Sequence, residues 1–409
     1  MKPASFGVVS SGAGIQSHLT IIAALLSMVG PFTIDTYLPS FPDIEAEFGI
    51  SRALLSQSLG IYLSAFAAST LFWGPLSDRI GRRLVILGSL LLYALASMGC
   101  ALADDVHTFM MFRVFQGLAA SGGFIASRAM IRDAHEAESA HRAMSQVTLL
   151  FAVAPAIAPI LGGWLHDQFG WRSIFWFLTS FGILLIGLTM FIEETLAQER
   201  RQSFQPVAVL RIYARTLKNK RFISLALSLA LSFAGLFLYI AGAPTVMYDF
   251  LGRGSNDFGL QFIPMVTGMM LGAFLSSHLA HRWPTRYTIR FGFGLMLITT
   301  LLNFLLASFF EAGILTVIGP LVLYAFGLAI VMPAITVLAL DCFPQHRGTA
   351  ASMQGFLQMS INAGVASKAV PFLHSEWSYF ALGQLVFLLL AWIFWFQSEH
   401  SSYESRVVP

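Results

Sequence analysis

Twelve long apolar segments restrict the folds open to this chain more than any other feature of its sequence. A helix that crosses a membrane needs about 20 consecutive, mostly apolar residues, and each segment reaches that length. The segments cover residues 18–39, 53–76, 84–103, 107–130, 142–165, 171–192, 222–247, 258–280, 286–310, 313–340, 348–372 and 376–397. Only 11% of the residues are charged, against about 25% in soluble domains. The sequence therefore predicts an all-α integral membrane protein with twelve transmembrane helices.

The basic residues predict the topology. One long polar segment divides the apolar segments six plus six, so we expect an N-terminal half over 1–192, a cytoplasmic linker over 193–221, and a C-terminal half with a short tail over 222–409. Lys and Arg accumulate on cytoplasmic loops. With both termini in the cytoplasm, 19 of the 24 Lys and Arg residues fall on cytoplasmic segments and three fall outside. Because topology accounts for the basic charge, we expect no nucleic-acid partner.

Three ionisable residues lie inside the predicted spans: Asp35, Arg113 and Lys368. A charge inside a membrane is costly, so each is a candidate for function. Pro31 and Pro39 each remove a backbone hydrogen bond near Asp35 and should open the helix on both sides of it. Open backbone at membrane depth is tolerated only where it lines a cavity or is buried in protein. We therefore expect Asp35 to face a central cavity; the alternative is a hydrated position near the outer interface.

Arg113 lies early in its span, at a depth comparable to that of Asp35, and its guanidinium does not lose its proton. A carboxylate beside it can alternate between an ion pair and a protonated state, as a proton-coupling site requires. The alternative is a static ion pair that fixes the packing of two helices. Lys368 lies in the outer half of its span, where its side chain can reach either the interface or the cavity.

The stretch GPLSDRIGRR, residues 74–83, follows the second span. Gly81 permits a tight reversal, and Asp78 and Arg82 stand one helical turn apart if the helix persists. Alternatively, this stretch is only a basic turn that follows the accumulation of Lys and Arg on cytoplasmic loops. Its spacing, however, resembles the loop signature of the major facilitator superfamily. RVFQGLAASGGFIASRAMIRD, residues 113–133, resembles a second signature of that superfamily, and AVAPAIAPILGGWL, residues 152–165, resembles its antiporter signature.

Three further stretches, IDTYLPSFPDI, AGLFLYIAGAPTVMYDFLG and RGTAASMQGFLQM, narrow the resemblance to the Bcr/CflA group of twelve-helix drug:proton antiporters. The resemblance implies the major facilitator (6+6) fold around a central cavity, in the bacterial cytoplasmic (inner) membrane. It also implies proton-coupling roles for Asp35 and Arg113. In this family a cytoplasmic latch holds the outward-open state, and the residues that match it are Gly74, Asp78, Arg79, Gly81, Arg82 and Asp133. The residues that match the antiporter motif are Pro155, Pro159, Gly162 and Gly163.

We therefore expect a secondary transporter that exports small amphipathic molecules by proton antiport with alternating access. The proton gradient is the expected energy source, with no cofactor and no metal, and the expected partners are a small-molecule substrate, protons and membrane lipid. We expect the chain to act as a monomer. The cavity wall should be rich in aromatic and amide side chains, each of which is alternatively a packing residue. The candidates are Phe32, Tyr37, Gln57, Tyr62, Gln116, Phe237, Tyr239, Gln354 and Gln358, with Lys368 in addition.

Other functions have less support in the sequence. A carrier of the same fold dedicated to one metabolite, such as a siderophore or a peptide, remains an alternative for export or uptake, because substrate choice lies in cavity side chains. An enzyme is not expected, because neither H-E-x-x-H nor G-x-S-x-G occurs. The absence of G-x-x-x-x-G-K-[ST] argues against ATP-driven transport.

Overall fold

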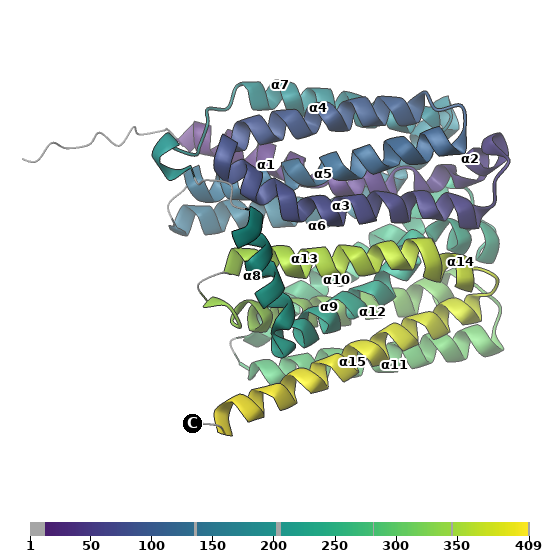
Figure 1. Cartoon of the computed structure of the whole chain (residues 1–409). Coiled ribbons are helices and arrows are strands. Elements are labelled where there is room, and N and C mark those ends of the chain that lie inside the picture. The colour runs from purple at the N-terminus through teal and green to yellow at the C-terminus, as the bar shows by residue number, and fades with distance from the viewer. Residues whose placement is uncertain (1–12, 135–136, 202–205, 281, 345–346, 408–409) are drawn as a thin grey trace, which may run out of the picture.

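The computed structural model describes residues 13–134, 137–201, 206–280, 282–344 and 347–407, and in it two bundles of long helices lie side by side (Figure 1). The apolar segments become helices because a membrane offers backbone N–H and C=O groups no water to bond. The N-terminal half consists of α1 (Ala13–Asp35), η1 (Leu38–Ser40), α2 (Phe41–Phe48), α3 (Arg52–Ile80), α4 (Arg82–Ala101), α5 (Val106–Ala134), α6 (Ala137–Phe169) and α7 (Arg172–Met190).

The second half follows a polar linker that holds η2 (Gln198–Arg200) and the amphipathic α8 (Pro206–Lys218). Its elements are α9 (Lys220–Ala241), η3 (Thr245–Phe250), η4 (Ser255–Phe258), α10 (Gly259–Ala280), α11 (Thr285–Phe309), α12 (Ile314–Leu340), α13 (Arg347–Gly364), η6 (Val365–Ala369), α14 (Val370–Leu373) and α15 (Trp377–Val407). The elements η3 and η6 are short π-helices.

Eleven helices of the described residues are long and apolar enough to cross a membrane. The predicted span 348–372 is not among them, because its polar residues, Gln354, Gln358, Asn362 and Lys368 among them, lower its hydropathy; the π-helical η6 also divides it into α13 and α14. The three pieces follow one another without a gap and account for the twelfth crossing. This arrangement agrees with the predicted twelve-helix fold.

The first helix differs from its prediction on one side of Asp35. Pro31 lies inside α1 and the helix continues through it, so the backbone does not open before Asp35. After Asp35 the helix ends, and the chain turns through η1, which has Pro39 within it, into α2. The expected break is therefore present only on the Pro39 side.

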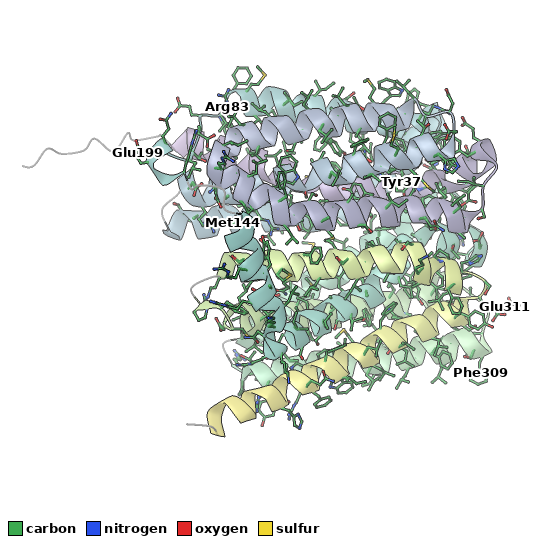
Figure 2. The ribbon with its side chains drawn as sticks, in the orientation of Figure 1. Tyr37, Arg83, Met144, Glu199, Phe309 and Glu311 are labelled. Carbon is green, nitrogen blue, oxygen red and sulfur yellow. The ribbon has the colours of Figure 1, made fainter. Side chains whose placement is uncertain are left out.

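One end of the bundle holds Arg79, Arg82 and Arg83, where α3 ends and α4 begins. Arg83 and Glu199 lie at one end, and Phe309 and Glu311 lie at the other (Figure 2). We call the first, where α3 ends and α4 begins, the arginine-rich end, and the second the opposite end. The first twelve residues, which include Lys2, and the last two lie outside the described residues.

Polar contacts join the two halves at the opposite end. Arg52 at the start of α3 forms an ion pair with Asp249 on η3, and the hydroxyl of Tyr248 donates to the carbonyl of Pro39. The carboxylate of Asp167 on α6 accepts hydrogen bonds from Ser255 and Asn256, which begin η4. Helix α3 also packs against α13 and η6. The halves are therefore closed against each other at this end.

Candidate functional site

Arg113 is the centre of a polar cluster inside the N-terminal half. Its side chain is 0% exposed on α5, and its guanidinium carbon lies 4.5 Å from the ring centre of Tyr37 and 4.6 Å from that of Tyr62. The Nη1 atom donates to Gln116 Oε1 at 2.7 Å and, more weakly, to the carbonyl of Thr33 at 3.4 Å. Two aromatic faces and two neutral oxygens thus surround a buried cation.

The cluster extends through neutral hydroxyl groups. Gln116 Nε2 donates to Ser97 Oγ on α4 at 2.8 Å, and the hydroxyls of Thr33 and Tyr93 lie 2.6 Å apart. The hydroxyls of Tyr37 and Ser58 lie 3.3 Å apart. Residues from α1, α3, α4 and α5 therefore meet around one guanidinium, and the Nε and Nη2 atoms of Arg113 have no hydrogen-bond partner in the described residues.

Asp35 is the last residue of α1 and is close in sequence to two residues of this cluster. Thr33 and Tyr37, which both contact Arg113, are each two residues away. Its side chain is 3% exposed, and its Oδ1 atom has no hydrogen-bond partner among the described residues. At this exposure Asp35 neither faces an open cavity, as expected, nor takes the alternative hydrated position near the outer interface in this conformation.

The expected pairing of Asp35 with Arg113 is not formed. Among the described residues, no carboxylate lies within ion-pair distance of Arg113. The guanidinium is instead held between the two tyrosine rings, and Gln116 takes the strong hydrogen bond that a carboxylate would receive. The static ion pair considered from the sequence is excluded on the same ground.

Most predicted cavity residues are buried within their own half in this conformation. Phe32 packs edge-on against two phenylalanines of α7, and Phe237 stacks on Phe233. Gln354 is also buried and donates weakly to Thr336 Oγ1 at 3.3 Å. The residues that are buried in this way, and so do not line an open cavity here, are Phe32, Tyr37, Tyr62, Gln116, Phe237, Tyr239 and Gln354. Gln57 and Gln358 are half-buried, and Lys368 is exposed on η6.

A second polar cluster, absent from the predictions except for Tyr239, lies inside the C-terminal half. Asn303 Nδ2 on α11 donates to the hydroxyl of Tyr239 at 2.7 Å and to Gln384 Oε1 on α15 at 2.9 Å. Gln261 Nε2 on α10 donates to the carbonyl of Tyr239 at 2.7 Å. The cluster carries no acidic or basic side chain, so it fixes helix packing without a formal charge. Isolated Asn and Gln residues in apolar segments are the only sequence signal that could have indicated it.

The predicted latch residues meet at the arginine-rich end. Arg82 forms ion pairs with Asp78 at 2.6 Å and with Asp133 on α5 at 2.8 Å. Gly81 has φ +106°, a conformation that favours glycine, and joins α3 to α4. Arg79 is exposed, and a side chain at Gly74 would meet only Ile125, at 3.9 Å.

Glu194, which the sequence did not single out, completes this group. Its carboxylate accepts from the backbone N–H groups of Arg82 at 2.9 Å and Arg83 at 3.1 Å, at the start of α4. An anion at a helix N-terminus is favourable because the first N–H groups have no partner within the helix. The group therefore ties α3, α4, α5 and the segment after α7 together within one half.

The antiporter-motif residues lie on α6, which runs unbroken past Pro155 and Pro159. A Cβ at Gly162 would collide with the carbonyl of Thr36, directly after Asp35, and a Cβ at Gly163 would collide with the carbonyl of Ser255 in the other half. The two glycines therefore permit close approach on two sides, toward the end of α1 and toward η4.

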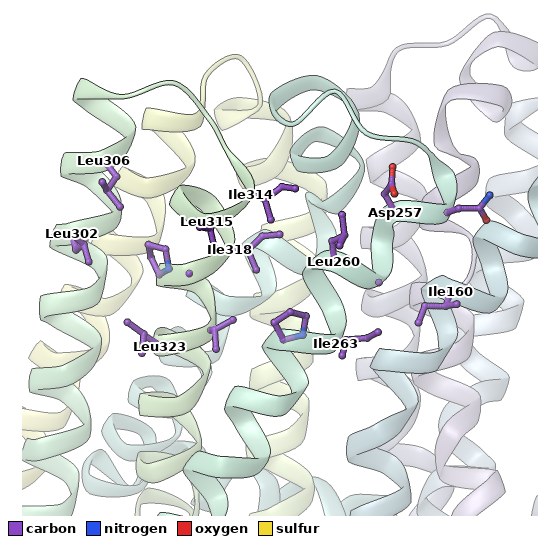
Figure 3. A pocket seen from close by; sticks show the side chains of 16 residues that line it. Ile160, Asp257, Leu260, Ile263, Leu302, Leu306, Ile314, Leu315, Ile318 and Leu323 are labelled. Carbon is purple, nitrogen blue, oxygen red and sulfur yellow. The ribbon is translucent and has the colours of Figure 1, made fainter.

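An apolar groove of about 980 Å³ lies elsewhere, at the opposite end of α10, α11 and α12 (Figure 3). Leu260, Ile263, Leu302, Ile314 and Leu323 are among its lining residues, and Asp257 lies at its rim. Leu302 and Leu323 are exposed, as expected of a surface in contact with lipid. The groove contains neither Asp35 nor Arg113 and is separate from the polar cluster.

Solved structures share this fold. A bacterial homolog of the human lysosomal transporter Spinster, solved in an inward-facing and unoccupied conformation, matches with a TM-score of 0.74 and 17% identity over 98% of this chain and 100% of that one. The xylose transporter XylE from Escherichia coli, in a partially occluded inward-open conformation, matches with a TM-score of 0.71 and 16% identity over 97% and 98%. At these identities the likeness shows the fold alone.

Sequence relatives cover most of the chain. A bicyclomycin resistance protein homolog from Haemophilus influenzae is 28% identical over 350 residues, which are 84% of this chain and 86% of the relative. Multidrug resistance protein D from Escherichia coli is 27% identical over 348 residues, 85% and 87% of the two chains. The family model of the Major Facilitator Superfamily matches residues 21–367. This integral membrane protein therefore belongs to the Major Facilitator Superfamily, as a transporter of its Bcr/CflA type.

Proposed function

We propose that this chain exports small amphipathic molecules from the bacterial cytoplasm in exchange for protons. The observation that carries the proposal is Asp35, a buried carboxylate with an unpartnered oxygen at the point where α1 ends. An ionised carboxylate that is buried without a partner is costly, so a proton is the simplest species to compensate it. The relatives are named for bicyclomycin and multidrug resistance, which favours drug export over a carrier for one metabolite.

The arginine-rich end is the cytoplasmic end in this proposal, with both termini inside, because Lys and Arg accumulate on cytoplasmic loops. Closure at the opposite end then makes the present conformation inward-facing. The chain acts as a monomer in the inner membrane, and the proton gradient supplies the energy without a cofactor.

Arg113 positions the proton site. Its guanidinium contacts the rings of Tyr37 and Tyr62 and the carbonyl of Thr33. Thr33 and Tyr37 are each two residues from Asp35. Asp35 receives a proton when the opposite end opens and substrate leaves. After the halves close there, substrate binding from the cytoplasm displaces the proton. The resemblance implies that the latch of Asp78, Arg82 and Asp133 stabilises the outward-open state, but its ion pairs are already formed within one half in this conformation, so they do not by themselves distinguish the two states.

The test uses purified protein in proteoliposomes with an imposed proton gradient, and bicyclomycin and a set of cationic dyes as the probes. Asp35→Asn should lose gradient-driven transport of a transported probe by at least about tenfold, because a neutral amide cannot exchange a proton. It should retain exchange of labelled for unlabelled probe. Asp104→Asn, an exposed carboxylate at the opposite end, is the matched control and should transport as wild type. Gradient-driven transport by Asp35→Asn at the wild-type rate would refute Asp35 as the coupling residue.

A further inference from the structure

Helix α8 carries a row of three cations that the transport mechanism does not use. Arg211, Arg215 and Lys218 are spaced four and three residues apart, so they share one face of the helix. All three are exposed, and no carboxylate among the described residues forms an ion pair with any of them. We call this face the basic row.

The basic row points away from the protein. Tyr213 and Thr216 lie on the far side of the helix from it and are buried. Ala214 and Leu217, on a flank between the two faces, are exposed. The helix therefore has one face packed on the protein, one charged face, and an exposed apolar flank, which is the pattern of a helix lying in a membrane interface.

The position of α8 agrees with that pattern. The helix crosses the long helices at a steep angle, close to the arginine-rich end (Figure 1). The Tyr213 hydroxyl donates to the carbonyl of Leu71 on α3 at 3.4 Å. Leu71 is nine residues before the end of α3 at Ile80, or about 13 Å along the axis. Helix α8 thus lies beside the membrane-spanning helices, near their arginine-rich ends, and not beyond those ends.

We propose that the basic row binds the phosphate groups of anionic glycerophospholipids in the adjacent leaflet. Guanidinium groups match phosphate geometry with two parallel hydrogen bonds, and each Lys or Arg near an anionic bilayer surface adds to the attraction. Helix α8 also contacts α3 in one half and α9 and α13 in the other. Bound lipid therefore holds the segment that connects the moving halves, and transport depends on anionic lipid.

Lipid binding is measured first, because it does not depend on the proposed function. The purified full chain is titrated in detergent with phosphatidylglycerol or with phosphatidylethanolamine, and bound lipids are counted by native mass spectrometry. The wild type should bind phosphatidylglycerol more tightly than phosphatidylethanolamine. The triple variant Arg211→Gln, Arg215→Gln, Lys218→Gln should bind phosphatidylglycerol about tenfold or more weakly. The charge-conserving variant Arg211→Lys, Arg215→Lys should keep most of the preference.

The matched control removes three exposed cations elsewhere at the same end: Arg282→Gln, Arg286→Gln, Arg290→Gln. Two of these already share Glu399 as an anionic partner, so this control should retain the preferred phosphatidylglycerol site. Equal phosphatidylglycerol affinity of the α8 triple variant and the wild type would overturn the proposal. The proposal would also be overturned if the wild type kept its full preference for phosphatidylglycerol in about 1 M ammonium acetate, where the Debye length is about 3 Å. This salt test uses only the wild type and does not depend on the folding of a variant.

A second measurement tests the consequence for transport and rests on the proposed function. In proteoliposomes in which phosphatidylcholine replaces phosphatidylglycerol, the wild-type rate should fall at least about threefold, and the rate of the α8 triple variant should be the same in both lipids. Equal wild-type transport rates in both lipids would overturn the proposed dependence of transport on anionic lipid. If no probe is transported by any variant, the proposed function fails while the lipid-binding result stands on its own.

Discussion

Replacing Gly60 with alanine should push the two halves apart at the opposite end. Gly60 lies on α3, where the helix crosses the other half. A Cβ atom there would be 2.5 Å from Ser367 Cβ on η6, 3.0 Å from the carbonyl oxygen of Ala363 and 3.1 Å from the backbone N of Ser367. Ordinary contacts of this kind begin at 3.4 Å. Helix α3 and η6 would therefore have to separate by about 0.9 Å, and none of the three atoms belongs to the end of a flexible side chain.

The magnitude follows from the cost of overpacking, which is typically about 1–3 kcal/mol. The penalty falls on the conformation in which α3 touches η6, and it vanishes when this end opens. Since about 1.4 kcal/mol corresponds to a factor of ten, the ratio of outward-open to inward-facing protein should rise about 5-fold to 140-fold. The gain in helix propensity from Gly to Ala is the same in both conformations and cancels.

The assay measures a distance between spin labels across the opposite end. Labels at Asp104→Cys and Glu311→Cys, both exposed and in opposite halves, are introduced after Cys100 and Cys342 have been replaced by alanine. Double electron–electron resonance should show a larger long-distance population in Gly60→Ala. Gly88→Ala is the control, because a Cβ there meets nothing within 4 Å. If Gly60→Ala and Gly88→Ala give the same distance distribution as the parent, the argument from close packing is refuted.

Three further changes test other contacts. Arg113→Lys keeps the charge but loses the planar group between two tyrosine rings, so proton-driven transport should fall at least about tenfold; wild-type rates would contradict the role of the guanidinium. Arg52→Gln removes an ion pair with Asp249, whose side chain is 46% exposed. Exposed ion pairs contribute little, so the outward-open population in the same spin-label assay should rise at most about fivefold. A larger rise would contradict this reasoning. Glu194→Gln weakens the anionic cap of α4 and should cost about 1 kcal/mol; an unchanged melting temperature in detergent would contradict this.

Local sequence features predicted the local structure around Asp35 and the latch. Pro39 predicted the end of α1, because a residue without an N–H cannot continue the hydrogen-bond ladder. Asp78 and Arg82 do form an ion pair, but not on one helix face: α3 ends at Ile80 and Arg82 begins α4, so the turn at Gly81 brings the two side chains together. The prediction that Pro31 opens the helix before Asp35 was wrong, because α1 continues through it. A proline inside a membrane helix is tolerated when neighbouring groups compensate the lost backbone hydrogen bond.

The direction that each side chain faces could not be predicted. In a soluble helix the apolar stripe marks the buried face, but in a membrane both the lipid and the protein interior are apolar, so that pattern is lost. Phe32 and Tyr37 were therefore expected at a cavity wall, and both are buried inside the N-terminal half. The π-helical η6, which divides α13 from α14, leaves no clear trace in an apolar sequence.

Length, hydropathy and charge act on each segment separately, so the amino-acid sequence was sufficient to predict the number of spans, the six-plus-six division and the positions of the costly charges. The packing of the helices was needed to show that Arg113 is held by Tyr37, Tyr62 and Gln116 and not by Asp35. It also decided that Arg52 meets Asp249, almost two hundred residues away. Such contacts depend on how the helices rotate and pack against one another, and no local pattern in one helix encodes the orientation of its neighbour.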